Sequence, residues 1–149
     1  MADLTVLINE KITLDGNDRG VLTTQTITGI NNIDNRIITA PTGSYTPLFF
    51  FEPDSFVNPG SFLTGSFQYG RITNKSNTLI ELRVIFNASP YTASFAITPG
   101  NSFILSSTKF AAGSMNNPSD NFVFPQTISS ITIQPSGSSA KIEYFIATT

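Results

Sequence analysis

The sequence predicts an all-β fold, a single antiparallel β-sandwich or jelly-roll-like domain that spans residues 1–149. Apolar and polar residues alternate with period two in short runs, and helical spacing is nearly absent. Gly, Pro, Asn and Asp separate these runs, as turn residues do. Thirteen Phe and four Tyr, with many Ile, Leu and Val, supply one core without disulfides in a chain of 149 residues.

In the first half of the chain, the alternation predicts short strands joined by turns. Asp15-Gly16-Asn17-Asp18 follows the first strand and favours a hairpin turn. Ala40-Pro41-Thr42-Gly43 closes a later strand. The strands expected here span residues 4–8, 21–27, 36–39, 61–67 and 68–73, the last two as a pair.

In the second half, the clearest strand spans residues 78–86, with Glu81 and Arg83 on its wetter face. Residues 92–98 and 102–106 are predicted to form a hairpin around the turn residues 99–101. Strands at 127–133 and 140–147 complete the chain, for about nine to twelve strands, which suits two packed sheets better than one open sheet. The side chains expected to point into the core from residues 78–106 are Ile80, Leu82, Val84, Phe86, Phe95, Ile97, Phe103 and Leu105.

Two stretches, residues 52–60 and 111–125, are rich in Pro, Asn, Ser and Gly and are predicted to be loops. The second stretch ends in Phe122 and Phe124. These two side chains either plug the open end of the sandwich or contact a partner, and the sequence leaves both alternatives open.

The chain has no His, Cys or Trp, which removes most nucleophilic, acid–base and metal chemistry. A serine nucleophile would need a lysine base, since the chain has no His. No Ser lies in a Gly-x-Ser-x-Gly setting, and Gly113-Ser114 and Gly137-Ser138 are predicted to be turns. Glu52 and Asp54 are the nearest thing to a catalytic acid pair, but Pro53 between them indicates a solvated loop. We therefore predict a protein that is not an enzyme and has no cofactor.

Two binding chemistries remain to be weighed. Asp15, Asn17 and Asp18 supply oxygen ligands suited to calcium, yet the same residues are explained by a hairpin turn, so no metal is predicted. Tyr45, Tyr69 and Tyr91 could stack on a sugar, or they are ordinary packed aromatics with the hydroxyl at the rim.

The charge of the chain argues against nucleic acid as a partner. The net charge is −2, and the eight Lys and Arg are scattered without a run that could neutralise many phosphates. Residues 1–6 show no basic and apolar leader, and the longest apolar stretches are far too short to span a bilayer. We expect no membrane association and synthesis in a cytoplasm.

Three segments resemble small virion structural proteins of tailed bacteriophages. Residues 69–76 read YGRITNKS, residues 95–105 read FAITPGNSFIL, and residues 142–148 read IEYFIAT. In the family pattern, an R-I-T-N strand is followed by L-x-P-G-x-S-F-x-L and by a similar last strand. The resemblance covers about half of the chain and implies a particle protein without enzymatic activity.

Within that family, a capsid decoration or cement protein fits best, located in the virion and bound to the major capsid protein or to other virion proteins. We expect a homo-oligomer, for which a trimer is one arrangement. The alternatives are a neck, tail or head-fibre component and a glycan-binding host-attachment module. The candidate interface residues are Leu4, Val6, Ile8, Phe49, Phe51, Phe56, Phe122 and Phe124, with residues 4–8 as an unprotected edge strand that pairs with a neighbour's sheet.

Overall fold

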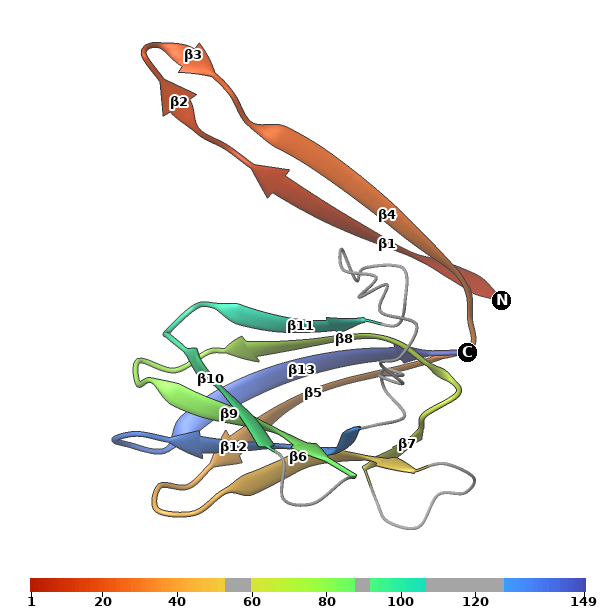
Figure 1. Ribbon diagram of the computed structural model, residues 1–149, viewed down its shortest axis with the longest axis vertical. Coiled ribbons are helices and arrows are strands. Elements are labelled where there is room, and N and C mark those ends of the chain that lie inside the picture. Colours follow the sequence, from red (N-terminus) through yellow and green to blue (C-terminus); the bar gives the residue numbers. More distant parts are fainter. Residues whose placement is uncertain (53–59, 88–91, 107–127) are drawn as a thin grey trace, which may run out of the picture.

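The computed structural model describes residues 1–52, 60–87, 92–106 and 128–149, in which all regular structure is strand (Figure 1). Thirteen strands are present there, two of them only two residues long, against the about nine to twelve expected. The strands are β1 (Ala2–Glu10), β2 (Thr13–Leu14), β3 (Asn17–Asp18), β4 (Val21–Ile30), β5 (Asn32–Ala40), β6 (Thr46–Glu52), β7 (Ser61–Leu63), β8 (Phe67–Asn74), β9 (Ile80–Phe86), β10 (Thr92–Ile97), β11 (Ser102–Ser106), β12 (Ile128–Pro135) and β13 (Ala140–Thr148).

Two sheets pack face to face and confirm the predicted β-sandwich. One sheet has five strands in the order β10-β9-β12-β6-β7, and the other has four in the order β11-β8-β13-β5. Neighbouring strands are antiparallel except β6 and β7, which are parallel. Strands that are neighbours in space are mostly distant in sequence, so most pairs are not hairpins.

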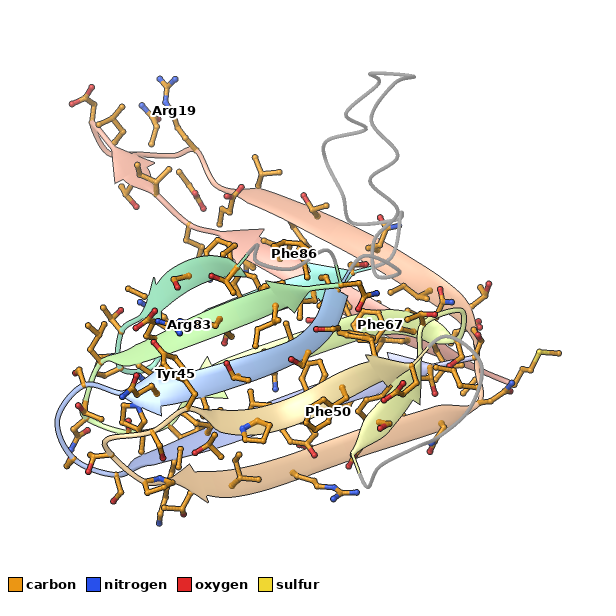
Figure 2. The ribbon with its side chains drawn as sticks, turned by 60° about the horizontal axis from the view of Figure 1, so that its bottom comes forward. Arg19, Tyr45, Phe50, Phe67, Arg83 and Phe86 are labelled. Carbon is orange, nitrogen blue, oxygen red and sulfur yellow. The ribbon has the colours of Figure 1, made fainter. Side chains whose placement is uncertain are left out.

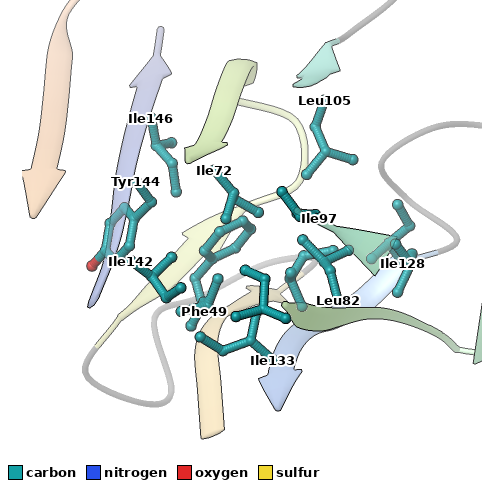
Figure 3. Close-up of a cluster of buried hydrophobic side chains, with 14 of the residues drawn as sticks. Phe49, Ile72, Leu82, Ile97, Leu105, Ile128, Ile133, Ile142, Tyr144 and Ile146 are labelled. Carbon is teal, nitrogen blue, oxygen red and sulfur yellow. The ribbon is translucent and has the colours of Figure 1, made fainter. Parts of the chain in front are cut away.

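The hydrophobic core lies between the two sheets and follows the predicted period of two. Phe49 of β6 is fully buried at its centre and makes edge-on ring contacts with Phe51, with Phe62 and, from the other sheet, with Tyr144 at 5.9 Å (Figure 3). Ile80, Leu82 and Val84 of β9 point into the core as expected. These contacts join the two layers into one body.

The predicted hairpin of residues 92–106 is wrong. β10 pairs with β9 in the five-stranded sheet, whereas β11 pairs with β8 in the four-stranded sheet. The turn between them, with Gly100 at φ 79°, carries the chain across the edge of the sandwich. Phe95, expected to point inward, is 41% exposed and packs at this edge against Phe103, with 4.8 Å between ring centroids.

The predicted pairing of residues 61–67 with 68–73 is also wrong. β7 pairs with β6 in one sheet, and β8 lies between β11 and β13 in the other. The chain crosses between the layers at residues 64–66, where the Ser66 amide donates to the Leu63 carbonyl. Alternation indicates which residues are strands, but a strand with two available sheets has more than one way to pair.

The N-terminal strands form a long hairpin that leaves the sandwich. β1 pairs with β4, and the short strands β2 and β3 continue the ribbon to its tip. Figure 1 shows this hairpin diverging from the sandwich from its base, near both termini, to its free tip. We call residues 2–30 the arm.

Candidate assembly interface

The arm is one ribbon in constant register from Leu4 to its tip. Leu4 lies opposite Ile27, and Thr13 opposite Asp18, so the strands reverse at Asp15 and Gly16. Asp15 has φ 52° and Gly16 has φ 77°, the left-handed pair that a two-residue hairpin turn requires. The turn was predicted from these residues, and the structure confirms it.

The base of the arm packs on the four-stranded sheet. Side chains alternate along β1 and β4, which places Leu4 and Val6 on the same face as their cross-strand partners Ile27 and Gln25. This face meets the sandwich: Ile27 is fully buried and Ile30 nearly so, against Tyr69, Phe145 and Ala147. We call this contact the arm base.

Beyond its base, the arm exposes apolar side chains on both faces. Six large ones are between 39% and 61% exposed: Leu7, Ile8, Ile12, Leu14, Val21 and Leu22. Neither β1 nor β4 contains Lys or Pro, and no other described strand pairs with their outer edges. Monomeric proteins usually protect such edges, so the arm has the properties of a surface that another chain covers.

The four-stranded sheet turns a second partly apolar surface to solvent, which we call the outer face. It is the face opposite to the core, and the arm base covers only the part around Tyr69, Phe145 and Ala147. Elsewhere it exposes Ile33, Ile37 and Ile104, each between 42% and 64%.

The outer face is positively charged. Glu143 accepts from Arg71 at 2.8 Å and lies 3.4 Å from the ammonium of Lys75. Lys141 is exposed two residues before Glu143 on the same side of β13. Three bases and one acid give this surface a net charge of +2.

A small polar hollow lies between the edge strands β5 and β7. Its volume is about 300 Å³, and Asp34, Arg36 and Ser61 are among its lining residues. Asp34 accepts from Arg36 at 2.8 Å and from the Tyr144 hydroxyl at 3.5 Å. Burial raises the pKa of Tyr144, and the Asp34 carboxylate raises it further. The Ser61 hydroxyl is buried and has no hydrogen-bond partner among the described residues.

A second polar cluster lies on the solvent side of the five-stranded sheet. Tyr45 donates to Glu81 at 2.8 Å, and the Arg83 guanidinium lies 3.8 Å from the centre of the Tyr45 ring (Figure 2). Hydrogen bonds from Ser94 and Tyr45 lower the pKa of Glu81, whereas burial and the Glu81 contact raise that of Tyr45. This arrangement stabilises both side chains in their usual charge states, as a structural cluster does.

The structure separates the predicted interface residues into three groups. Leu4 and Val6 are half-buried in the arm base, and Ile8 is 39% exposed just beyond it. Phe49 and Phe51 are buried in the core, because their side chains point between the two sheets, and they offer no surface to a partner. Phe56, Phe122 and Phe124 lie outside the described residues.

Tyr45, Tyr69 and Tyr91 were considered for sugar binding, and Glu52 with Asp54 for acid catalysis. Tyr69 is buried beneath the arm and cannot stack on a sugar, Tyr45 is engaged by Arg83, and Tyr91 lies outside the described residues. Glu52 ends β6, and Asp54 also lies outside the described residues.

Sequence reasoning missed most of the arm's apolar surface. The hairpin turn and the exposed edge at residues 4–8 were predicted, but not the exposure of Val21 and Leu22. A signal was present, since these two neighbours point to opposite faces of a strand and both are apolar, although a sandwich strand has only one buried face.

In the described ranges, no three His, Cys, Asp or Glu side chains gather into a metal-binding group, and no helix there is long and apolar enough to cross a membrane. No protein-family model matches the chain, and no curated protein sequence matches it. The surfaces of the arm and of the outer face are therefore the basis for proposing a function.

Proposed function

We propose that the chain is a structural protein of a tailed-bacteriophage virion, without enzymatic activity, that decorates and cements the capsid by binding the major capsid protein. The single observation that carries this proposal is the arm, a ribbon that leaves the sandwich with apolar side chains on both faces. A two-stranded ribbon standing alone in water is marginally stable at best. An arm of this kind is better suited to an assembly, in which neighbours cover it, than to a free monomer.

The edges of the arm supply the second part of the mechanism. One edge of β1 pairs with no other described strand along its nine residues, and the apolar Leu4, Val6 and Ile8 lie on this strand. Backbone pairing with the sheet edge of a neighbouring virion protein adds a strand and needs no particular side chain. Many copies of such a modest contact, arranged as homo-oligomers or trimers on the shell, give strong cumulative binding.

Other positions in the particle use the same contacts with a different symmetry. A neck, tail or head-fibre component would place the arm between the subunits of a ring or a fibre. The fold and the surfaces are the same in each case, so the location must be measured.

Glycan binding is a second candidate, and the polar hollow between β5 and β7 favours it. The hollow joins the carboxylate of Asp34 and the guanidinium of Arg36, which are groups that bind sugar hydroxyls. A glycan array probed with the purified protein tests this candidate. Binding that Asp34→Asn abolishes would favour attachment, and absence of binding to every glycan on the array would remove the candidate.

Cryo-electron microscopy of the virions that carry this chain tests the main proposal. Density of this size as symmetric bumps on the shell, with mass spectrometry identifying the chain, would support decoration. Density at the neck, tail or fibre tips would favour the alternative positions. Purified virions without the chain would overturn the proposal.

Cementing is tested separately by heating. Virions that lack the protein are expected to release their DNA at a lower temperature than complete virions, and adding the purified protein back should restore the higher temperature. Equal release temperatures would mean that the protein decorates the shell without stabilising it.

A further inference from the structure

We propose that the arm of one copy packs along the outer face of a second copy of this chain. This inference deepens the proposed function, on which it rests for its biological setting, by naming the two surfaces that associate. The exposed arm is thus covered by another molecule of the same protein, and the outer face of each copy binds the arm of a neighbouring copy.

The first support is the contact that the arm already makes with its own sheet. At the arm base, Leu4, Val6 and Ile27 pack on Tyr69, Phe145 and Ala147, so aliphatic arm residues and the outer face fit together. The same face of the arm continues beyond its base with Ile8 and Val21, and the constant register places Ile12 and Leu14 on it as well. All four are exposed.

The outer face continues in the same way. Past the arm base it exposes Ile33, Ile37 and Ile104, which are aliphatic like the exposed side chains of the arm. Each copy therefore has an apolar arm surface and an apolar sheet surface that extend one existing contact and that nothing in the described residues covers. The arm diverges from its own sandwich toward the tip, so beyond its base it does not lie on its own outer face (Figure 1).

Charge is the second, independent support. The arm contains Asp3, Glu10, Asp15 and Asp18 against Lys11 and Arg19, a net charge of −2 that equals the net charge of the whole chain. The outer face, with Arg71, Lys75, Lys141 and Glu143, has a net charge of +2. An acidic arm and a basic sheet attract each other between copies and disfavour arm–arm contact.

In a closed oligomer every copy uses both surfaces, since its arm packs on a neighbour and its own outer face binds the arm of a neighbour.

Sedimentation equilibrium of the full chain and of three variants tests the inference. Ile8→Ser/Val21→Ser changes the arm face that packs on the sheet, and Ile37→Ser/Ile104→Ser changes the outer face. Each is expected to weaken self-association about tenfold or more, because two apolar contacts are lost. The matched control is Leu7→Ser/Leu22→Ser, which removes two even more exposed apolar side chains from the opposite face of the same arm and should leave the association constant within about twofold.

Mixing the first two variants sharpens the test. The arm-face variant keeps an intact outer face and the outer-face variant keeps an intact arm, so a mixed pair retains one native contact and should associate more tightly than either variant alone. The charge reversal Lys75→Glu/Lys141→Glu changes the outer face from +2 to −2 and should also weaken association. Added salt should then strengthen the association of this variant, whereas it weakens that of the unchanged protein. Circular dichroism confirms that each variant is folded.

Three results would overturn the inference: a monomer at about 1 mM, association that neither the arm-face nor the outer-face variant changes, or equal weakening by the control. The second result would indicate pairing through strand edges instead. A virion that carries the chain while the purified protein remains monomeric would overturn this inference and leave the proposed function standing. Self-association through these surfaces in a protein found on no virion would do the reverse.

Discussion

Asn74, at the end of β8, is completely buried, and its amide makes four hydrogen bonds. Its nitrogen donates to the carbonyl oxygens of Thr78 at 2.8 Å and Ile97 at 2.9 Å, and its oxygen accepts from the Ser76 amide and hydroxyl. One side chain thereby joins the β8–β9 turn to the end of β10. Asn74 belongs to the R-I-T-N segment, but the sequence showed no reason for this amide to be buried.

Asn74→Ala is expected to destabilise the protein by about 2–4 kcal/mol, because it leaves two carbonyl oxygens without their donor in the interior. Chemical denaturation measures the change in the free energy of unfolding. Asn77→Ala, three residues away in the same turn and exposed, is the control and should change it by less than about 0.5 kcal/mol. Equal effects of both substitutions would contradict the role assigned to Asn74.

Buried tyrosines make the stability fall at alkaline pH. Burial raises the pKa of both Tyr69 and Tyr144 above the ordinary value of 10.0. The unfolded chain then loses these protons at a lower pH than the folded protein. The free energy of unfolding therefore keeps its full value below about pH 10 and decreases as the pH rises further. Tyr144→Phe should reduce this decrease, and urea denaturation between pH 8 and 11 at about unit intervals measures it. An unchanged pH dependence would show that Tyr144 does not contribute.

The sequence predicts where the chain turns, but it does not predict which of the two sheets a strand joins. Asp15-Gly16 predicted the tip of the arm because that turn needs two left-handed residues, which these types adopt readily. Pro99-Gly100-Asn101 has equally strong turn chemistry, yet it connects strands in different sheets. What decides between a hairpin and a crossing is the packing of distant strands, to which local sequence contributes little.

Gly20 is expected to matter for the arm and not for the sandwich. A Cβ at this position would collide with the Glu10 backbone oxygen, so Gly20→Ala should distort the ribbon near its tip. Gly65→Ala is the control, since a Cβ there meets no atom within 4 Å. Hydrogen exchange should show faster exchange in β1 and β4 of Gly20→Ala alone, with the core strands unchanged. Faster exchange in β8 and β13 would mean that the arm and the sandwich unfold together.

At the scale of the whole molecule, the sandwich depends on contacts between the sheets. Phe49 of one sheet meets Tyr144 of the other, and Phe51 meets Phe67 with 5.1 Å between ring centroids. The aromatic content of the chain and its period-two runs predicted such a core. They also placed Phe49 and Phe51 in an interface, because four consecutive apolar residues suit a surface loop as well as an interior strand until the neighbouring strands are known.

Phe49→Ala is expected to lower the free energy of unfolding by about 3–5 kcal/mol, because it opens a cavity where the two sheets meet. Phe50→Ala on the opposite side of β6, where the side chain is half-buried, should cost clearly less. Denaturant titration of both variants gives the comparison. A larger effect of Phe50→Ala would show that the solvent side of this strand, and not its core side, holds the molecule together.

The arm base joins residues that are far apart in the order of synthesis. The two strands of the arm pair through their own turn, whereas the surface on which they pack includes Phe145 and Ala147 of β13. On the ribosome, the arm is therefore complete while the surface that shelters Leu4, Val6 and Ile27 has not yet been made. Until β13 is added, the entire apolar face of the arm is open, and neighbouring nascent chains or a chaperone can bind it. Once β13 has formed, it covers the arm base, and only the outer half of the arm remains available for assembly.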